Sequence, residues 1–155
     1  MHTRRELLSR SAQLATLLAA AGCLPGIAGA QSGAWNAAAF EAKGVAEAMK
    51  ALGVAAPVES KEVTISAPDI AENGAVVPIG AATTLANAKR LLILVEKNPS
   101  TLAASFELTD SIEPTVATRV KMGESSNVYA VAITADNKVL FARKEVKVTL
   151  GGCGG

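Results

Sequence analysis

The sequence predicts an all-β domain, a β-sandwich with an N-terminal helix and a flexible C-terminal arm. Short segments in which apolar and polar residues alternate recur after Pro57, and polar turn residues separate them, a pattern typical of a sandwich. Half of the 155 residues are apolar, which is enough for a core, but aromatic residues make up only 3%. Alanine, valine and leucine must therefore fill most of that core.

The first 30 residues have the pattern of a twin-arginine signal peptide. Arg4-Arg5 precedes an apolar stretch over residues 12–21, and Ala28-Gly29-Ala30 offers the small residues that a signal peptidase recognises. We expect cleavage after Ala30 and a periplasmic mature protein. One alternative stays open, because Ala20-Ala21-Gly22-Cys23 resembles a lipoprotein box, which would place a lipid on its cysteine.

The mature chain, residues 31–150 before the arm, is expected to begin its folded domain with one amphipathic helix. Asn36 is placed to cap the helix and Gly53 to end it, although Gly44 weakens its middle. The apolar residues, spaced by three or four, are Phe40, Val45, Ala48, Met49 and Leu52.

Alternation and turn signals then predict eight strands. These are Glu62–Ala67, Ala75–Ile79, Lys89–Val95, Ala103–Thr109, Thr115–Met122, Val128–Thr134, Lys138–Ala142 and Lys144–Leu150. The continuous apolar run in Lys89–Val95 predicts a strand that is buried on both faces, and Asn98-Pro99 should stop it. Residues 135–137 predict the turn of a hairpin. In the last strand, Val146, Val148 and Leu150 are expected to face inward.

Charge argues against two classes of partner. The signal contains Arg4, Arg5 and Arg10 against Glu6, a charge of +2, and subtracting it from the overall +1 leaves −1 on the mature chain. This chain has no basic excess to attract nucleic acid or an anionic membrane, so we expect neither as a partner.

Export would also remove His2, the one histidine, and Cys23, one of the two cysteines. A mature chain with a single cysteine and no histidine excludes cysteine–histidine and serine–histidine–aspartate catalysis, an internal disulfide and a Cys-x-x-Cys redox pair. It also lacks an ordinary zinc or haem ligand set, so we expect no cofactor and no metal.

The remaining cysteine, Cys153, stands between two pairs of glycines, Gly151-Gly152 and Gly154-Gly155. Glycines are costly to order, so this segment is expected to be a flexible arm, about 17 Å long when fully extended. No basic residue in the arm lowers the thiol pKa from its usual value near 8.5. We therefore interpret Cys153 as a handle for a substrate on which other enzymes act.

The arm motif resembles the carboxyl end of the SoxY family, the sulfur-carrier subunits of the bacterial thiosulfate-oxidising Sox pathway. The resemblance extends over essentially the whole mature chain. The segments that carry it, besides residues 151–155, are Ile70–Ile79 (I-A-E-N-G-A-V-V-P-I), Asn98-Pro99 with Phe106, Thr118–Lys121 and Val146–Thr149.

The resemblance implies an immunoglobulin-like sandwich that forms a heterodimer with a SoxZ-like subunit. It implies that Cys153 becomes covalently joined to sulfur from thiosulfate. A haem cytochrome would couple thiosulfate oxidatively to the thiol, a hydrolase would release sulfate, and further enzymes would process the remaining sulfur. The chain itself would be a carrier and not an enzyme.

Two alternatives stay open at this point. In the first alternative, the chain is an exported immunoglobulin-like binding or assembly module whose single cysteine forms an intersubunit disulfide. Glu72-Asn73-Gly74 is interpreted as a tight turn before a strand, and in the family it is also a candidate contact with SoxZ. We assign no site residue there.

Overall fold

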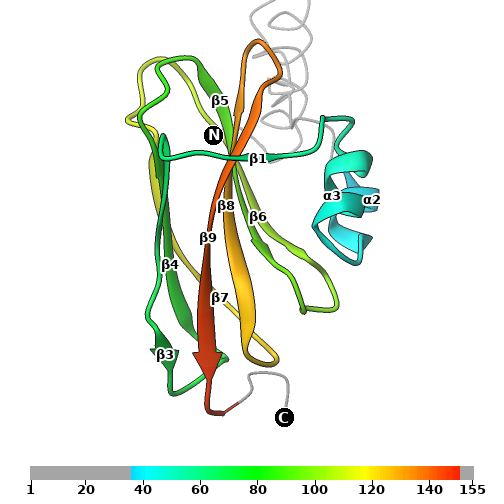
Figure 1. Ribbon diagram of the computed structural model, residues 1–155, viewed down its shortest axis with the longest axis vertical. Coiled ribbons are helices and arrows are strands. Elements are labelled where there is room, and N and C mark those ends of the chain that lie inside the picture. Colours follow the sequence, from blue (N-terminus) through cyan, green and yellow to red (C-terminus); the bar gives the residue numbers. More distant parts are fainter. Residues whose placement is uncertain (1–35, 151–155) are drawn as a thin grey trace, which may run out of the picture. The chain divides into compact units, whose positions relative to one another are not determined.

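The computed structural model describes residues 36–150 and confirms an all-β, immunoglobulin-like sandwich (Figure 1). The predicted signal with its cleavage after Ala30, and the predicted flexible arm Gly151–Gly155, lie outside the described residues. The helices are α2 (Ala37–Glu41) and α3 (Val45–Ala51). The strands are β1 (Val58–Glu59), β2 (Val63–Ser66), β3 (Ile70–Ala71), β4 (Val77–Thr83), β5 (Ala88–Val95), β6 (Leu102–Glu107), β7 (Thr115–Val120), β8 (Ser126–Thr134) and β9 (Val139–Val148). No helix within residues 36–150 is long and apolar enough to cross a membrane.

Two sheets form the sandwich. The larger sheet has the order β1-β9-β8-β5-β6, with β3 also paired to β9, and the smaller has the order β2-β4-β7. Strands β1 and β3 both run parallel to β9, at opposite ends of it. Sequence reasoning missed these two strands because each is only two residues long.

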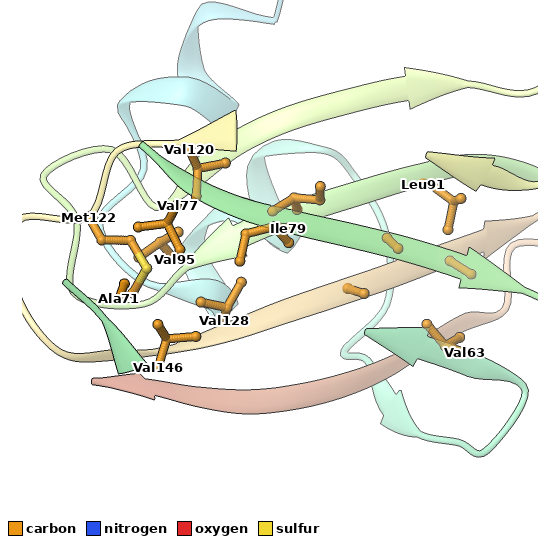
Figure 2. Packing of buried hydrophobic residues seen from close by; sticks show 14 of the residues in the cluster. Val63, Ala71, Val77, Ile79, Leu91, Val95, Val120, Met122, Val128 and Val146 are labelled. Atoms are coloured by element: carbon orange, nitrogen blue, oxygen red, sulfur yellow. The ribbon is translucent and has the colours of Figure 1, made fainter. Parts of the chain in front are cut away.

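The prediction that β5 is buried on both faces is confirmed. Leu91, Ile93 and Val95 point into the core between the two sheets, part of which Figure 2 shows. Leu92 and Leu94 point the other way, into a second core that the two helices cover. Alternate side chains of one strand thus serve two cores, which explains why its apolar run has no polar interruption.

The helical region differs from the prediction of a single helix. Asn36 does cap α2, its side chain accepting a hydrogen bond from the Ala39 N–H at 3.1 Å, and Gly53 follows the end of α3 with a φ of +69°. Between the helices, Gly44 has a φ of +108° and its N–H donates to the Thr101 hydroxyl at 2.6 Å. That backbone angle is incompatible with a continuous helix, so α2 and α3 are separate.

The predicted hairpin is confirmed, since β8 and β9 pair antiparallel around the turn at residues 135–137. The two strands predicted over residues 138–150 are a single strand, because the pairing with β8 continues from Val139 to Val146 without a break. Val146 is fully buried and Val148 is half-buried, but Leu150 is 67% exposed, so its predicted inward orientation is wrong. It lies past the last paired residue, where the sheet no longer provides a core beneath it.

Candidate functional site

The predicted site residues, Cys153 and the glycines Gly151, Gly152, Gly154 and Gly155, lie outside the described residues. The structure describes the segment that leads to them, Val148–Leu150, which we call the arm root. It also describes residues 70–76, which hold the arm root and which we call the root loop. Figure 1 shows β3, the first part of this loop, beside the end of β9.

The root loop holds the arm root through backbone hydrogen bonds that continue past the end of the strand. Ala71 pairs with Val148 in parallel, and the Thr149 N–H donates to the Ala71 carbonyl at 3.1 Å. The Thr149 hydroxyl donates to the Glu72 carbonyl at 3.0 Å, and the Gly74 N–H donates to the Leu150 carbonyl at 2.7 Å. The chain is therefore fixed as far as Leu150.

A second element holds the arm root from the side of the β7–β8 connection. The Ser125 hydroxyl accepts a hydrogen bond from the Val148 N–H at 2.9 Å. Val148 is thus held by Ser125 and by β3 at once. Two parts of the chain that are distant from Val148 in the sequence therefore hold it in place.

The root loop is itself well anchored. Its turn is closed by the Asn73 side chain, which accepts from the Ala75 N–H at 2.9 Å, and the Gly74 carbonyl accepts from the Met122 N–H at 2.7 Å. Ala71 and Met122 are both buried, and Figure 2 shows them with Val146 at the same end of the core. The predicted turn at Glu72-Asn73-Gly74 is confirmed, and it has the further role of holding the arm root.

Sequence reasoning did not find that role. The hydrogen bond from Thr149 to Glu72 joins residues 77 positions apart, and no local pattern reports such a contact. The available signal was indirect, since Ile70–Ile79 and Val146–Thr149 both belong to the segments that resemble SoxY.

Uncharged hydrogen-bonding groups hold the arm root in place. The groups that hold it are backbone amides and carbonyls and the hydroxyls of Ser125 and Thr149. Within residues 36–150 no group of three or more histidine, cysteine, aspartate or glutamate side chains is arranged to hold a metal ion. These contacts fix the position of Leu150, which precedes Cys153 by three residues in the sequence.

Comparison with known proteins identifies the family of the chain. The family model described as "Sulfur oxidation protein SoxY" matches residues 48–153, so the chain belongs to the SoxY family. No curated protein matches the chain. The family is one of sulfur carriers in sulfur oxidation and not of enzymes, and this assigns the chain a sulfur-carrier role.

Solved structures agree. The sulfur carrier protein SoxY from Chlorobium limicola f thiosulfatophilum is 38% identical, with 61% of this chain and 86% of that chain covered and a TM-score of 0.55. Two structures of variants of a superoxide reductase (neelaredoxin) from Ignicoccus hospitalis are 18% and 19% identical, each with a TM-score of 0.50. They cover 56% and 64% of this chain and 78% and 86% of their own. At that identity they share the fold alone.

Proposed function

We propose that this protein carries sulfur intermediates of thiosulfate oxidation covalently on Cys153 and presents them to partner enzymes. One observation carries the proposal: the chain is hydrogen-bonded as far as Leu150, and Cys153 follows only three residues later. The family match supports it, because the matched region extends through Cys153. In the sequence, the thiol therefore follows three residues after Leu150, which the sandwich holds by a backbone hydrogen bond.

Loading of the arm is an oxidation. The Cys153 thiol joins the outer sulfur of thiosulfate, giving Cys153 Sγ–S–SO3⁻, one proton and two electrons, which a haem cytochrome accepts. Water then cleaves the bond between the terminal sulfone and the neighbouring sulfur. This hydrolysis needs no oxidant, and it releases sulfate and protons and leaves a persulfide on Cys153. The carrier supplies the attachment point, and the partner enzymes supply the chemistry.

The remaining parts of the proposal concern location and assembly. The twin arginine and Ala28-Gly29-Ala30 support export to the periplasm with cleavage after Ala30. Membership of the SoxY family supports partners from the Sox pathway in general. We propose a heterodimer with a SoxZ-like subunit, and a Sox haem cytochrome and hydrolase as the enzymes that act on the arm.

Mass spectrometry of the intact protein tests the proposal. After incubation with thiosulfate and the haem cytochrome, we expect an added mass equal to one S–SO3 group. Hydrolysis by the hydrolase should then lower the added mass to that of one sulfur atom. A Cys153→Ser variant should acquire neither mass, and sulfate release should fall to the background. The proposal fails if the adduct forms equally on the variant. It also fails if the thiol is found only in a disulfide-linked dimer on non-reducing electrophoresis.

A further inference from the structure

We infer that the arm end of the sandwich carries a docking surface for the enzymes that act on the arm, centred on the exposed apolar side chains of Ile70, Val76 and Leu150. The inference rests on the proposed function, because it concerns enzymes that take up Cys153. We call these three residues the root patch.

The first observation is where exposed apolar side chains occur. Among the described residues, large apolar side chains that are more than half exposed are few. They are Val58 (62%), Ile70 (58%), Val76 (52%), Ile112 (56%) and Leu150 (67%). Three of them belong to the arm root or to the root loop that is hydrogen-bonded to it. The other two lie at the opposite end of the sandwich, where Val58 pairs with Leu140 of β9.

Backbone contacts place the three residues of the root patch at the same end of the sandwich. Ile70 lies opposite Lys147 of β9, and Lys147 precedes Leu150 by three positions in the sequence. Val76 follows two positions after Gly74, whose N–H donates to the Leu150 carbonyl at 2.7 Å. All three therefore lie on backbone segments that are directly joined at the arm root.

The short reach of the arm makes contact at this place unavoidable. Three residues separate Leu150 from Cys153, and three fully extended residues span about 10 Å. An enzyme that binds the sulfur in a channel must therefore bring the mouth of that channel to within about 10 Å of Leu150. Whatever surface surrounds the arm root meets the enzyme.

The composition of this surface suits a transient contact with an apolar centre. Exposed charged and polar residues flank Ile70 and Leu150 in the sequence, and they include Asp69, Glu72 and Thr149. Apolar residues at the centre with polar residues around them are typical of the core and rim of a protein interface. Three exposed apolar side chains make a small contact area, which is typical of transient complexes rather than of stable dimers.

A permanent subunit is a poorer occupant of this surface. Any protein that covered Leu150 permanently would occupy the space that a visiting enzyme needs in order to reach Cys153. We therefore assign the root patch to the enzymes that visit the arm, and place the contact with a SoxZ-like subunit elsewhere on the domain.

The test compares substitutions at the two ends of the sandwich in the full exported chain, purified with any subunit that accompanies it. Cys153 is loaded with tetrathionate: the thiolate attacks a central sulfur atom, forms Cys153 Sγ–S–SO3⁻ and releases thiosulfate, so no other oxidant is needed. Sulfate release by a purified Sox hydrolase is then measured as kcat and KM. The root-patch variants are Ile70→Glu, Val76→Glu and Leu150→Glu, and the controls are Val58→Glu and Ile112→Glu.

We expect each root-patch variant to raise KM about tenfold, because a carboxylate replaces an apolar contact, while each control stays within about twofold of the unaltered protein. The reaction of the unloaded thiol with a small disulfide reagent should be the same in all variants, which shows that Cys153 itself is unaffected. Thermal unfolding checks that each variant is folded, and Leu150→Ala offers a milder change with a smaller rise in KM.

The outcomes separate the inference from the proposed function. If the unaltered protein is neither loaded nor turned over, the proposed function fails. If it is turned over and the root-patch variants match the controls, the inference is wrong. It is also wrong if these variants lose an accompanying subunit, or change from a dimer of this chain to a monomer, because the patch would then be a subunit interface.

Discussion

The two ends of strand β9 are held in different ways. At the hairpin end, residues 134–138, the chain reverses within a tight turn in which Thr134 and Lys138 bond each other and Asn137 has a φ of +59°. At the arm end, residues 147–150, the chain is held by the root loop, up to 78 positions away in the sequence. The first end closes through its own turn residues, with further hydrogen bonds to Asn87, whereas the second has no turn of its own and depends on distant parts of the fold.

The difference between the two ends shows where the position of the chain depends on tertiary contacts. A hairpin reverses the chain through its own turn residues. An arm that must start at a defined place needs an external support, and the root loop with its buried Ala71 provides one. The comparison can be tested by weakening each end separately.

The largest effect is expected from truncating a core side chain at each end. Met122→Ala and Ile133→Ala each remove a buried side chain, exposed by 0% and 5%, and each should lower the free energy of unfolding by about 2–5 kcal/mol. Urea denaturation measures the loss. The Met122 N–H bonds Gly74, so only Met122→Ala should also speed amide hydrogen exchange at Gly74 and Thr149 relative to the global loss. Equal exchange in the two variants would contradict the dependence of the arm root on the core.

A smaller effect is expected from removing one hydroxyl at each end. Thr134→Val removes a buried hydroxyl that accepts a hydrogen bond from the Lys138 N–H at 3.0 Å. This change should lower the free energy of unfolding by about 1–3 kcal/mol. Thr149→Val removes an exposed hydroxyl that donates to the Glu72 carbonyl. This change should lower the free energy of unfolding by about 0.5–1.5 kcal/mol at most. Denaturation gives both values. A larger loss for Thr149→Val would reverse the order that burial predicts.

The smallest effect concerns pH at the hairpin end. The Thr134 hydroxyl, followed by Lys138, lowers the pKa of Asp136 from 3.8 to about 2. A carboxyl with a lowered pKa contributes stability above pH 3.8, and that stability is lost as the pH falls towards 2. The melting temperature of Asp136→Asn should therefore fall slightly less than that of the unaltered protein between about pH 5 and pH 2. An identical fall in both proteins would show that this group contributes nothing.

Local patterns were sufficient for much of the fold. The alternation in β7 and the uninterrupted apolar run of β5 identify strands because each residue's environment follows from its neighbours. The pattern was insufficient where a pairing partner decides the outcome. Strands β1 and β3 exist only through their contact with β9, and the single backbone angle at Gly44 divides one predicted helix into two.

For the candidate site, too, the sequence predicted one part and did not predict another. Residue type alone singled out Cys153, since a lone thiol among glycines has little use in packing. The support for it was not visible, because Ala71 and Thr149 are brought together by folding and not by spacing. Leu150 was assigned inward on alternation alone, and its exposure became clear only once the end of the sheet was known.

The pairing of β9 on both sides has a mechanical consequence. If a force acts on Leu150 along β9, the hydrogen bonds to β8 and β3 lie across the direction of that force. The load is therefore shared in shear by many bonds at once, instead of opening them one after another as in a peeled edge. In the proposed function, strand β9 would therefore stay paired when a partner enzyme pulls on the chain beyond Leu150.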